Sequence, residues 1–295
     1  MRKERLFKYI SLDKDIHLND KKLSDIAMNK AWLSIFGALN DPFEAKATYF
    51  NRELLHNNSG ASNLLLDFME LLINYLNDKY VVYSLTGSSY DCLPMWAHYA
   101  NNHQGFCVEY ELDTSFYDLP DVMCDIKKVD YSESRKSITA YIEEQLQFYE
   151  DMKSTYFAEP SDLIKVKITD ALIEAQNKNF FTKHLSWSYE NEYRLIYTAV
   201  SHGDFPHGNT ELINQNLKLI NAKLLDLQKE RGILVNLSEI GLCVSNIYVG
   251  IECNEEYSKL LNRISSSLGC GNAHKVSISK QCKEFRLSTT EIIGY

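Results

Sequence analysis

The chain has 295 residues, of which 45% are hydrophobic and 24% charged, a composition that suits one large globular domain or two small ones. Its 40 acidic and 31 basic residues give a formal net charge of -9, which disfavours general binding to duplex nucleic acid. Seven cysteines without a CxxC pair, and a start without an apolar run, predict free thiols in a reducing cytoplasm. No stretch approaches the about 20 apolar residues of a membrane helix, so no membrane partner is expected.

The first elements are predicted from their hydrophobic periodicity. The apolar and aromatic segment 6–11 predicts a strand. Residues 18–34 place apolar side chains near the helical period, so a single helix is expected there. Residues 37–46 break this pattern with turn-forming side chains, and residues 61–80 predict a buried helix that is apolar around more than half of its circumference.

The centre of the chain predicts a strand, a short helix and another strand. Residues 80–89 combine β-branched and aromatic side chains and end in a Gly/Ser turn, which is typical of a strand. A short helix is expected over residues 93–103, begun at Pro94, because the missing N–H costs nothing in a first helical turn. The next strand is expected over residues 105–112, from Gly105.

The second half begins with helix-type, charged segments. Residues 132–157 and 161–185 predict a helical insertion over about 132–183, which forms a lobe beside the sheet. The remaining expected elements are a strand at 193–200, a helix over 210–232 ended by Gly232, and strands at 244–251 and 274–280.

Strands at both ends of the chain with helices between them predict an α+β fold. With 5 prolines and 12 glycines the chain has few built-in breakers, which favours one continuous domain over residues 1–295. We expect a split or strongly bent mixed sheet. Three polar, aromatic stretches that lie far apart in the sequence are expected to meet at one cleft of this sheet.

The segment WSYENEYRLIY, residues 187–197, carries two glutamates just before a buried strand. Alternate residues of a strand share a face, so Glu190, Glu192 and Arg194 are expected to point the same way. One interpretation is a structural pair of Glu192 with Arg194. The other is a cleft that uses a carboxylate as a base or as a clamp on a cation, with Glu192 facing the cleft and Glu190 at its mouth.

The usual enzyme signatures are absent. The sequence contains no GxGxxG, GxxxxGK[ST], GxSxG or HExxH motif, so dinucleotide-binding folds, P-loop enzymes, α/β hydrolases and zincins lose support. The later cysteines and His274 match no zinc-ligand spacing, so we predict buried thiols and no metal.

The segment NDPFEAK permits two interpretations. Glu44 and Lys46 form an ExK pair, as in metal-dependent nucleases where carboxylates hold Mg²⁺ and the lysine polarises water. The alternative, which the sequence favours, is a turn in which Asp41 caps and Phe43 anchors.

Hydroxyl and imidazole side chains supply further candidates. Ser84 and Thr86 share one strand face near a turn, where their hydroxyls satisfy backbone groups or contact a ligand. His98 and His103 are five residues apart and do not stack on one helix face, which favours surface or capping roles over a ligand or general base.

Three motifs taken together carry a resemblance: NDPFE, SLT followed by MWAHYANNHQGFCVEY, and WSYENEYRLIY. They resemble a large bacterial and phage-associated family catalogued as domain of unknown function 2971, whose members begin with a YKY-like strand, here FKY. IYVG is similar to the C-terminal strand of the family, so the resemblance spans nearly the whole chain. It implies a toxin or a phage-defence effector.

The order of elements also resembles the ADP-ribosyltransferase fold. Enzymes of that fold carry a basic or histidine residue on the first strand, a hydroxyl residue on a middle strand, and a glutamate, often within ExE, on a late strand. The resemblance gives Lys8 the first place, Ser84 and Thr86 the second, and Glu190 with Glu192 the third. Two departures are that lysine is not the usual first residue and that SLT lacks the third hydroxyl of an STS motif.

This second resemblance implies NAD as the substrate. Breaking the bond between nicotinamide and ribose builds positive charge on the sugar, which a carboxylate stabilises. The catalytic residues expected are Glu192, Glu190 and Lys8. The expected substrate-binding residues are Tyr9, Asn40, Asp41, Phe43, Ser84, Thr86, Trp96, His98, Tyr99 and Arg194.

Three classes of function stay open. The first is an NAD-consuming transferase or glycohydrolase, for which a nucleotide is the small-molecule partner. The second is a metal-dependent nuclease or other hydrolase. The third is a non-catalytic binding or regulatory module, and the sequence names no macromolecular target for any of them.

Overall fold

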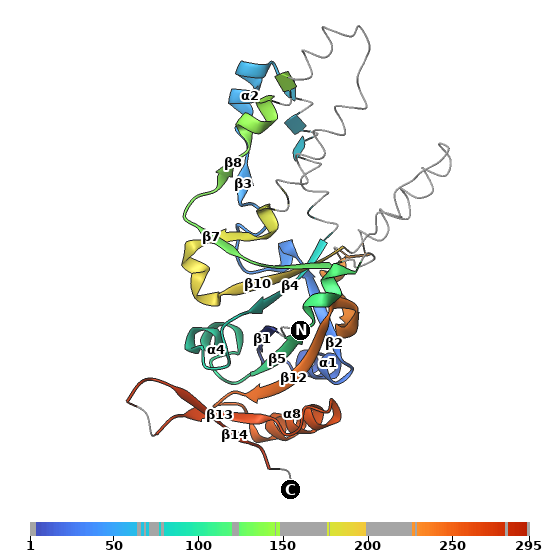
Figure 1. The fold of residues 1–295 in the computed structure, drawn as a ribbon, viewed down its shortest axis with the longest axis vertical. Coiled ribbons are helices and arrows are strands. Elements are labelled where there is room, and N and C mark those ends of the chain that lie inside the picture. Colours follow the sequence, from blue (N-terminus) through green and yellow to red (C-terminus); the bar gives the residue numbers. More distant parts are fainter. Residues whose placement is uncertain are drawn as a thin grey trace, which may run out of the picture.

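The computed structural model describes most of the chain. The described residues are 4–63, 66–67, 69–70, 77, 80–119, 124–144, 146–147, 176, 178–198, 226–227, 229–280 and 283–293. Helices and a large mixed sheet confirm the α+β fold (Figure 1). None of the described helices is both long and apolar enough to cross a bilayer.

The sheet has ten strands within the described residues. They are β1 (Glu4–Ile10), β2 (Lys30–Ile35), β4 (Tyr80–Thr86), β5 (Phe106–Leu112), β6 (Cys124–Lys128), β10 (Glu192–Thr198), β11 (Gly232–Asn236), β12 (Leu242–Val249), β13 (His274–Ile278) and β14 (Leu287–Glu291). The order is β11-β2-β4-β1-β5-β12-β13-β14, with β10 paired to β4 and β6 paired to β10. Only β12 and β13 run parallel among these pairs, so the sheet is mixed.

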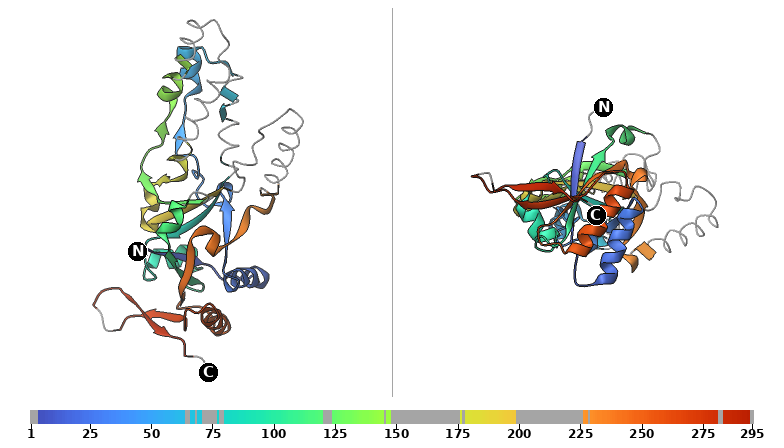
Figure 2. Two further views of the ribbon diagram at one scale, coloured as in Figure 1. Left: turned by 45° about the vertical axis from the view of Figure 1, so that its right-hand side comes forward. Right: turned by 90° about the horizontal axis from the view of Figure 1, so that it is seen from below.

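Alternating residues of β1 separate the two layers of the core. Leu6 belongs to the larger apolar cluster, which α1 (Ile16–Ala27) and α8 (Glu255–Ser267) cover. Phe7 belongs to a second cluster beneath α4 (Leu93–Tyr99). The period-two alternation of strand side chains therefore places α1 and α8 on one face and α4 on the other (Figure 2).

The sheet forks at β4. β10 pairs with one edge of β4 along its whole length, from Thr86 to Tyr80. On the opposite edge, β2 pairs at Val82 and β1 at Thr86. Between these two contacts the carbonyl of Ser84 accepts a hydrogen bond from Lys8 Nζ at 2.7 Å instead of from a strand. The fork opens the space in which the clefts described below lie.

A smaller lobe projects from one end of the sheet. It contains β3 (Thr48–Tyr49), β8 (Lys136–Ser137) and α2 (Arg52–Ser59), which Figure 1 shows at the top. Leu55, Met69 and Ile142 are buried in a cluster of their own, separate from the two clusters of the sheet.

Most sequence-predicted strands are confirmed. β1, β4, β5, β10, β12 and β13 occur where the sequence predicted strands, and α4 begins at Leu93, one residue before the predicted Pro94. The single helix predicted over 18–34 is wrong in its second half, because α1 ends at Ala27 and β2 follows. The segment KAWLSI buries alternate residues against the core, and pairing with β4 and β11 overrides its helical spacing.

The ends of the predicted insertion contain strands. β7 (Asp130–Ser132), β8 and β9 (Thr182–His184) occupy its two ends, where helix was expected, and helix begins only at residue 139. Residues 148–175, most of 61–80 and residues 199–225 lie outside the described part, so the helices predicted there stay predictions. Arg231, not Gly232, takes the left-handed conformation before β11, with a φ of 62°. The strands β6, β11 and β14 were not predicted.

Gly105 occupies a tight contact between the α4 turn and β1. A Cβ added at Gly105 would lie 2.0 Å from the carbonyl oxygen of Ile10. We expect Gly105→Ala to lower the free energy of unfolding by about 1–3 kcal/mol, because the backbone must shift to admit a methyl group. Urea unfolding measures the change. Gly37→Ala is the matched control, since nothing lies within 4 Å of its added Cβ. Equal midpoints for the two variants would contradict this account.

Candidate functional site

A cleft of about 380 Å³ opens beside the fork of the sheet, between β1, β4, α4 and the start of β10. We call it the carboxylate cleft. It brings together parts of all three sequence motifs and of the first strand. The sequence-predicted residues that line it are Lys8, Tyr9, Asn40, Ser84, Thr86, His98, Tyr99, Glu190 and Glu192.

Four other predicted binding residues do not line this cleft. Asp41 is buried and its Oδ1 accepts the backbone N–H of Phe43 at 2.9 Å, so it caps the turn, while the Phe43 side chain is 55% exposed. Trp96 is fully buried in the core, where its Nε1 donates to the carbonyl of Tyr90 at 2.6 Å. Arg194 is fully buried behind the cleft. Turn geometry and core packing account for all four positions.

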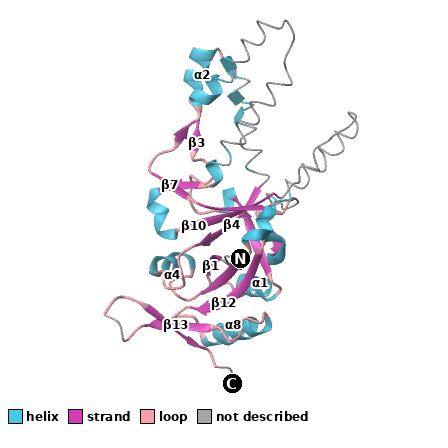
Figure 3. Ribbon diagram, in the orientation of Figure 1, coloured by secondary structure: helices cyan, strands magenta, loops and turns pink. Residues whose placement is uncertain are grey.

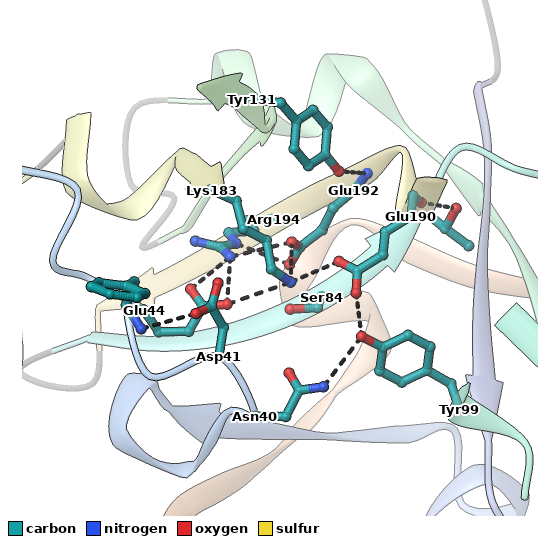
Figure 4. A network of polar contacts seen from close by, with 12 residues as sticks. Asn40, Asp41, Glu44, Ser84, Tyr99, Tyr131, Lys183, Glu190, Glu192 and Arg194 are labelled. Carbon is teal, nitrogen blue, oxygen red and sulfur yellow. Dashed lines mark hydrogen bonds and ion pairs between the residues drawn. The ribbon is translucent and has the colours of Figure 1, made fainter. Parts of the chain in front are cut away.

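The backbone that carries the two glutamates differs from the regular strand that the sequence predicted. Glu190 ends the 3-10 helix η3 (Leu185–Glu190), and Glu192 begins β10. Asn191 between them takes a left-handed conformation with a φ of 45°. The carboxylates converge nevertheless, since Lys183 Nζ contacts Glu190 Oε2 at 2.7 Å and Glu192 Oε2 at 3.3 Å (Figure 4).

Arg194 holds the carboxylates from behind. Its Nε donates to Glu192 Oε1 at 2.9 Å, and Nη2 lies 2.7 Å from Glu44 Oε2. Its Nη1 donates to the carbonyl of Phe180 at 2.6 Å. Burial by itself lowers the pKa of Arg194, but Glu192 and Glu44 outweigh it and the net pKa is raised. The interpretation of Glu192 and Arg194 as an ion pair therefore matches the geometry.

The pKa values of Glu192 and Glu44 shift in opposite directions beside the same two cations. Burial raises the pKa of both carboxyl groups, and Arg194 and Lys183 lower it. The cations prevail at Glu192, whose pKa is lowered, whereas burial prevails at Glu44, whose pKa is raised. Glu192 is thus the more strongly ionised of the two.

Lys183 was not predicted as a site residue. It lies on β9, which pairs in parallel with β7 and sets Tyr131 opposite Lys183. Its Nζ is 3.5 Å from Glu44 and 4.7 Å from the centre of the Trp187 ring. Burial lowers the pKa of Lys183, but the three carboxylates raise it above its usual value. A lone lysine at the end of a helix-type segment gives no sequence signal for this role.

Glu190 lies at the end of the network that meets Tyr99. Tyr99 donates its hydroxyl hydrogen to Glu190 Oε1, and Asn40 Nδ2 donates to the Tyr99 oxygen at 3.4 Å (Figure 4). Burial and the bond to Glu190 raise the pKa of Tyr99, so the phenol stays a neutral donor. Thr86 fixes the backbone here by donating its hydroxyl to the carbonyl of Glu190 at 2.5 Å.

Lys8 is the half-buried cation on the opposite wall. Its Nζ donates to the Ser84 carbonyl and lies 4.3 Å from the centre of the Tyr83 ring. Burial lowers the pKa of Lys8 to about 8, although Glu192 opposes this shift. Lys8 therefore exchanges its proton near neutral pH, unlike an ordinary lysine.

This lowered pKa predicts selective acylation. At pH 8 about half of the Lys8 side chains carry no proton, whereas less than about 1% of ordinary lysines do. Because only the neutral amine attacks, we expect limiting acetic anhydride to modify Lys8 at least about 10-fold faster than the exposed Lys259. Peptide mass spectrometry measures both rates. Modification of Lys8 that is no faster than that of Lys259 would show that the amine is an ordinary one.

The acidic residues of this region face cations of the protein itself. In the part of the chain that the structure describes, no three His, Cys, Asp or Glu side chains are grouped so that they could hold a metal ion. Glu44 contacts Arg194, and Lys46 donates to the carbonyl of Pro42 at 3.1 Å, so the ExK pair does not point into one site.

One comparison with known proteins gives a match. Residues 95–195 match the model of a family described as a protein of unknown function (DUF2971). This segment contains the MWAHYANNH and WSYENEYRL motifs, whereas FKY, NDPFE, SLT and IYVG lie outside it, so the match is shorter than the resemblance expected from the sequence. No curated protein and no solved structure matches the chain. Over residues 95–195, the chain is similar to the DUF2971 family.

Proposed function

We propose that the carboxylate cleft binds a nucleotide and cleaves the N-glycosidic bond of NAD. The observation that carries this proposal is the convergence of Glu190 and Glu192 with Lys8 and Ser84, from η3, β10, β1 and β4, on one cleft. Its volume of about 380 Å³ lies in the range of small-molecule sites. The distant resemblance to the ADP-ribosyltransferase fold supports the same chemistry, and it stays a resemblance because no solved structure matches.

The reaction requires a carboxylate beside the ribose. The bond between nicotinamide and ribose C1′ breaks, its electron pair leaves with nicotinamide, and positive charge develops on the ribose ring. Water or an acceptor hydroxyl then forms the new bond to C1′ and releases a proton. The products are nicotinamide and either ADP-ribose or an ADP-ribosylated acceptor.

The contacts favour Glu190 as the carboxylate that meets the ribose. Both oxygens of Glu192 are held by Arg194, and Lys183 contacts one of them as well. Glu190 is held by Lys183 on one oxygen and by the Tyr99 hydroxyl on the other. A ribose hydroxyl can replace the phenol without breaking an ion pair. We therefore reverse the roles expected from the sequence. Glu190 is the carboxylate that meets the ribose, and Glu192 positions Lys183.

A non-catalytic binding module is the second candidate. It is supported by the charge balance of the network, in which Glu44, Glu190 and Glu192 face Lys183, Arg194 and Lys8. In such a network each carboxylate already has a cation of the protein as its partner and requires no substrate as a counter-charge. No geometry among the described residues favours the nuclease alternative.

The deciding experiment is incubation of the pure protein with NAD and measurement of nicotinamide by chromatography. Catalysis predicts release of nicotinamide at a rate proportional to protein concentration, with equal loss of NAD. Binding of NAD in calorimetry without any release would favour the binding module instead.

The biological part of the proposal is that the protein acts as a toxin or phage-defence effector, and it rests on the resemblance to the bacterial and phage-associated family. Induced expression should then slow growth of the host cell, and Glu190→Gln should restore it at equal protein level. Equal growth of cells that express either protein would contradict a toxic activity at this site.

A further inference from the structure

A second cleft adjoins the carboxylate cleft through the fork of the sheet. Its volume is about 490 Å³, and it lies between β1, β2, β4 and α1. The two clefts share Lys8, Tyr9, Leu39, Ser84 and Tyr99, so they adjoin each other where Lys8 meets the Ser84 carbonyl. We call the second part the lysine cleft, after Lys8, Lys21, Lys22 and Lys30 in its lining.

The lysine cleft is positively charged in a negatively charged protein. Its lining contains these four lysines and one acidic residue, Asp25, whereas the whole chain carries a formal net charge of -9. The lining of the carboxylate cleft has the opposite balance, with three glutamates and two lysines. A ligand that spans both parts must therefore be anionic at one end and rich in hydroxyls or cationic at the other.

The lysines differ in how they are held. Lys22 donates to the Ser11 carbonyl at 2.8 Å and to Asp13 at 3.0 Å, so it is fixed in place. Lys21 is exposed at the rim, with its Nζ 4.3 Å from the centre of the Trp32 ring. Lys30 is half-buried in the wall. Lys21 and Lys30 are the cations most free to meet a ligand in this lining.

Asp25 offsets only part of this charge. Its side chain is buried, and burial raises the pKa of Asp25 although Lys21 and Lys30 oppose the shift. The lining sets one carboxylate against four lysines, so the cleft keeps a positive charge that attracts anions.

We propose that the lysine cleft binds the phosphate groups of a nucleotide whose ribose extends past Ser84 into the carboxylate cleft. Lys21 and Lys30 contact the phosphate oxygens, and the half-buried Trp32 ring holds the Lys21 ammonium group at the rim. The position of the ribose rests on the proposed function, whereas the phosphate site does not. A small nucleotide fits better than a nucleic acid strand, because the positive charge is confined to a cleft of about 490 Å³ within a chain of net charge -9.

The test is calorimetric titration of the full chain with ADP, inorganic pyrophosphate and adenosine at constant salt. The variant Lys21→Gln/Lys30→Gln should weaken ADP and pyrophosphate binding by about 10-fold or more, equivalent to losing about 1.4 kcal/mol. Adenosine binding, which involves no phosphate, should stay unchanged. Lys259→Gln, on the exposed face of α8, is the matched control and should bind ADP like the wild type.

Two results would overturn the proposal. One is ADP affinity that is equal in Lys21→Gln/Lys30→Gln and in the wild type, with melting temperatures that show both proteins folded. The other is lysine-dependent binding of a single-stranded oligonucleotide without any binding of ADP or pyrophosphate.

The outcome is separable from that of the NAD assay. Lysine-dependent ADP binding without nicotinamide release would remove the catalytic proposal and leave the phosphate site in place. If nicotinamide is released and the double lysine substitution changes neither KM nor kcat, the catalytic proposal stands and the phosphate site is removed.

Discussion

Arg194→Met is expected to lower the free energy of unfolding by about 3–5 kcal/mol, because it strands buried charges. The substitution keeps much of the side-chain volume but leaves Glu44 and Glu192 with Lys183 as their remaining cation contact in the described network. It also removes the donor to the Phe180 carbonyl. Urea unfolding followed by circular dichroism measures the loss.

Two further variants make this result specific. Arg263→Met makes the same chemical change at an exposed position of α8 and should leave stability close to the wild-type value. Arg194→Lys keeps the charge but cannot contact Glu192, Glu44 and the Phe180 carbonyl together. Its free energy of unfolding should therefore lie between those of Arg194→Met and the wild type. An unfolding free energy for Arg194→Met within about 1 kcal/mol of the wild type would mean that the carboxylates are neutral or solvated.

Glu190→Gln is expected to reduce nicotinamide release by about 100-fold or more, as loss of a group that stabilises developing charge does. The amide is isosteric, and its oxygen still accepts a hydrogen bond from Lys183 while its NH2 group donates to the Tyr99 oxygen. Lys183 also keeps Glu44 and Glu192 as partners, so the melting temperature should change little. Initial rates with saturating NAD, together with thermal unfolding, separate these two effects.

Glu192→Gln gives the contrasting result. It removes a charge that pairs with the fully buried Arg194, so we expect a clear loss of stability together with any loss of activity. Glu256→Gln, in the exposed first turn of α8, controls for the loss of one negative charge. A stable Glu190→Gln protein with wild-type rates would exclude Glu190 from the chemistry.

The sequence predicts the parts of the site that lie on regular strands. The side chains of Lys8 and Ser84 belong to segments whose periodicity and composition identify β1 and β4. The pairing of Glu192 with Arg194 follows from the two-residue period of β10. These features depend on local sequence alone, which is why they could be predicted.

The rest of the site depends on contacts between distant segments. Lys183 joins the carboxylates because β9 pairs with β7, about 50 residues earlier in the chain, and no local pattern encodes that pairing. Glu44 was considered only with Lys46, since its partner Arg194 is 150 residues away. The left-handed Asn191 turns Glu190 out of the strand in which the sequence pattern placed it.

The place of Lys183 ties the position of a whole segment to the charge state of the cleft. Its backbone belongs to β9, next to β7 and outside the large sheet, while Glu190 ends η3, Glu192 begins β10 and Glu44 precedes β3. A displacement of β9 by one residue would carry the ammonium group away from three carboxylates at once. Acidification, which protonates Glu44 before Glu192, should therefore loosen β9, and a cationic ligand in the cleft should compete with Lys183 for the carboxylates. Lys183 on β9 and a cationic ligand are thus alternative counter-ions for the same three carboxylates.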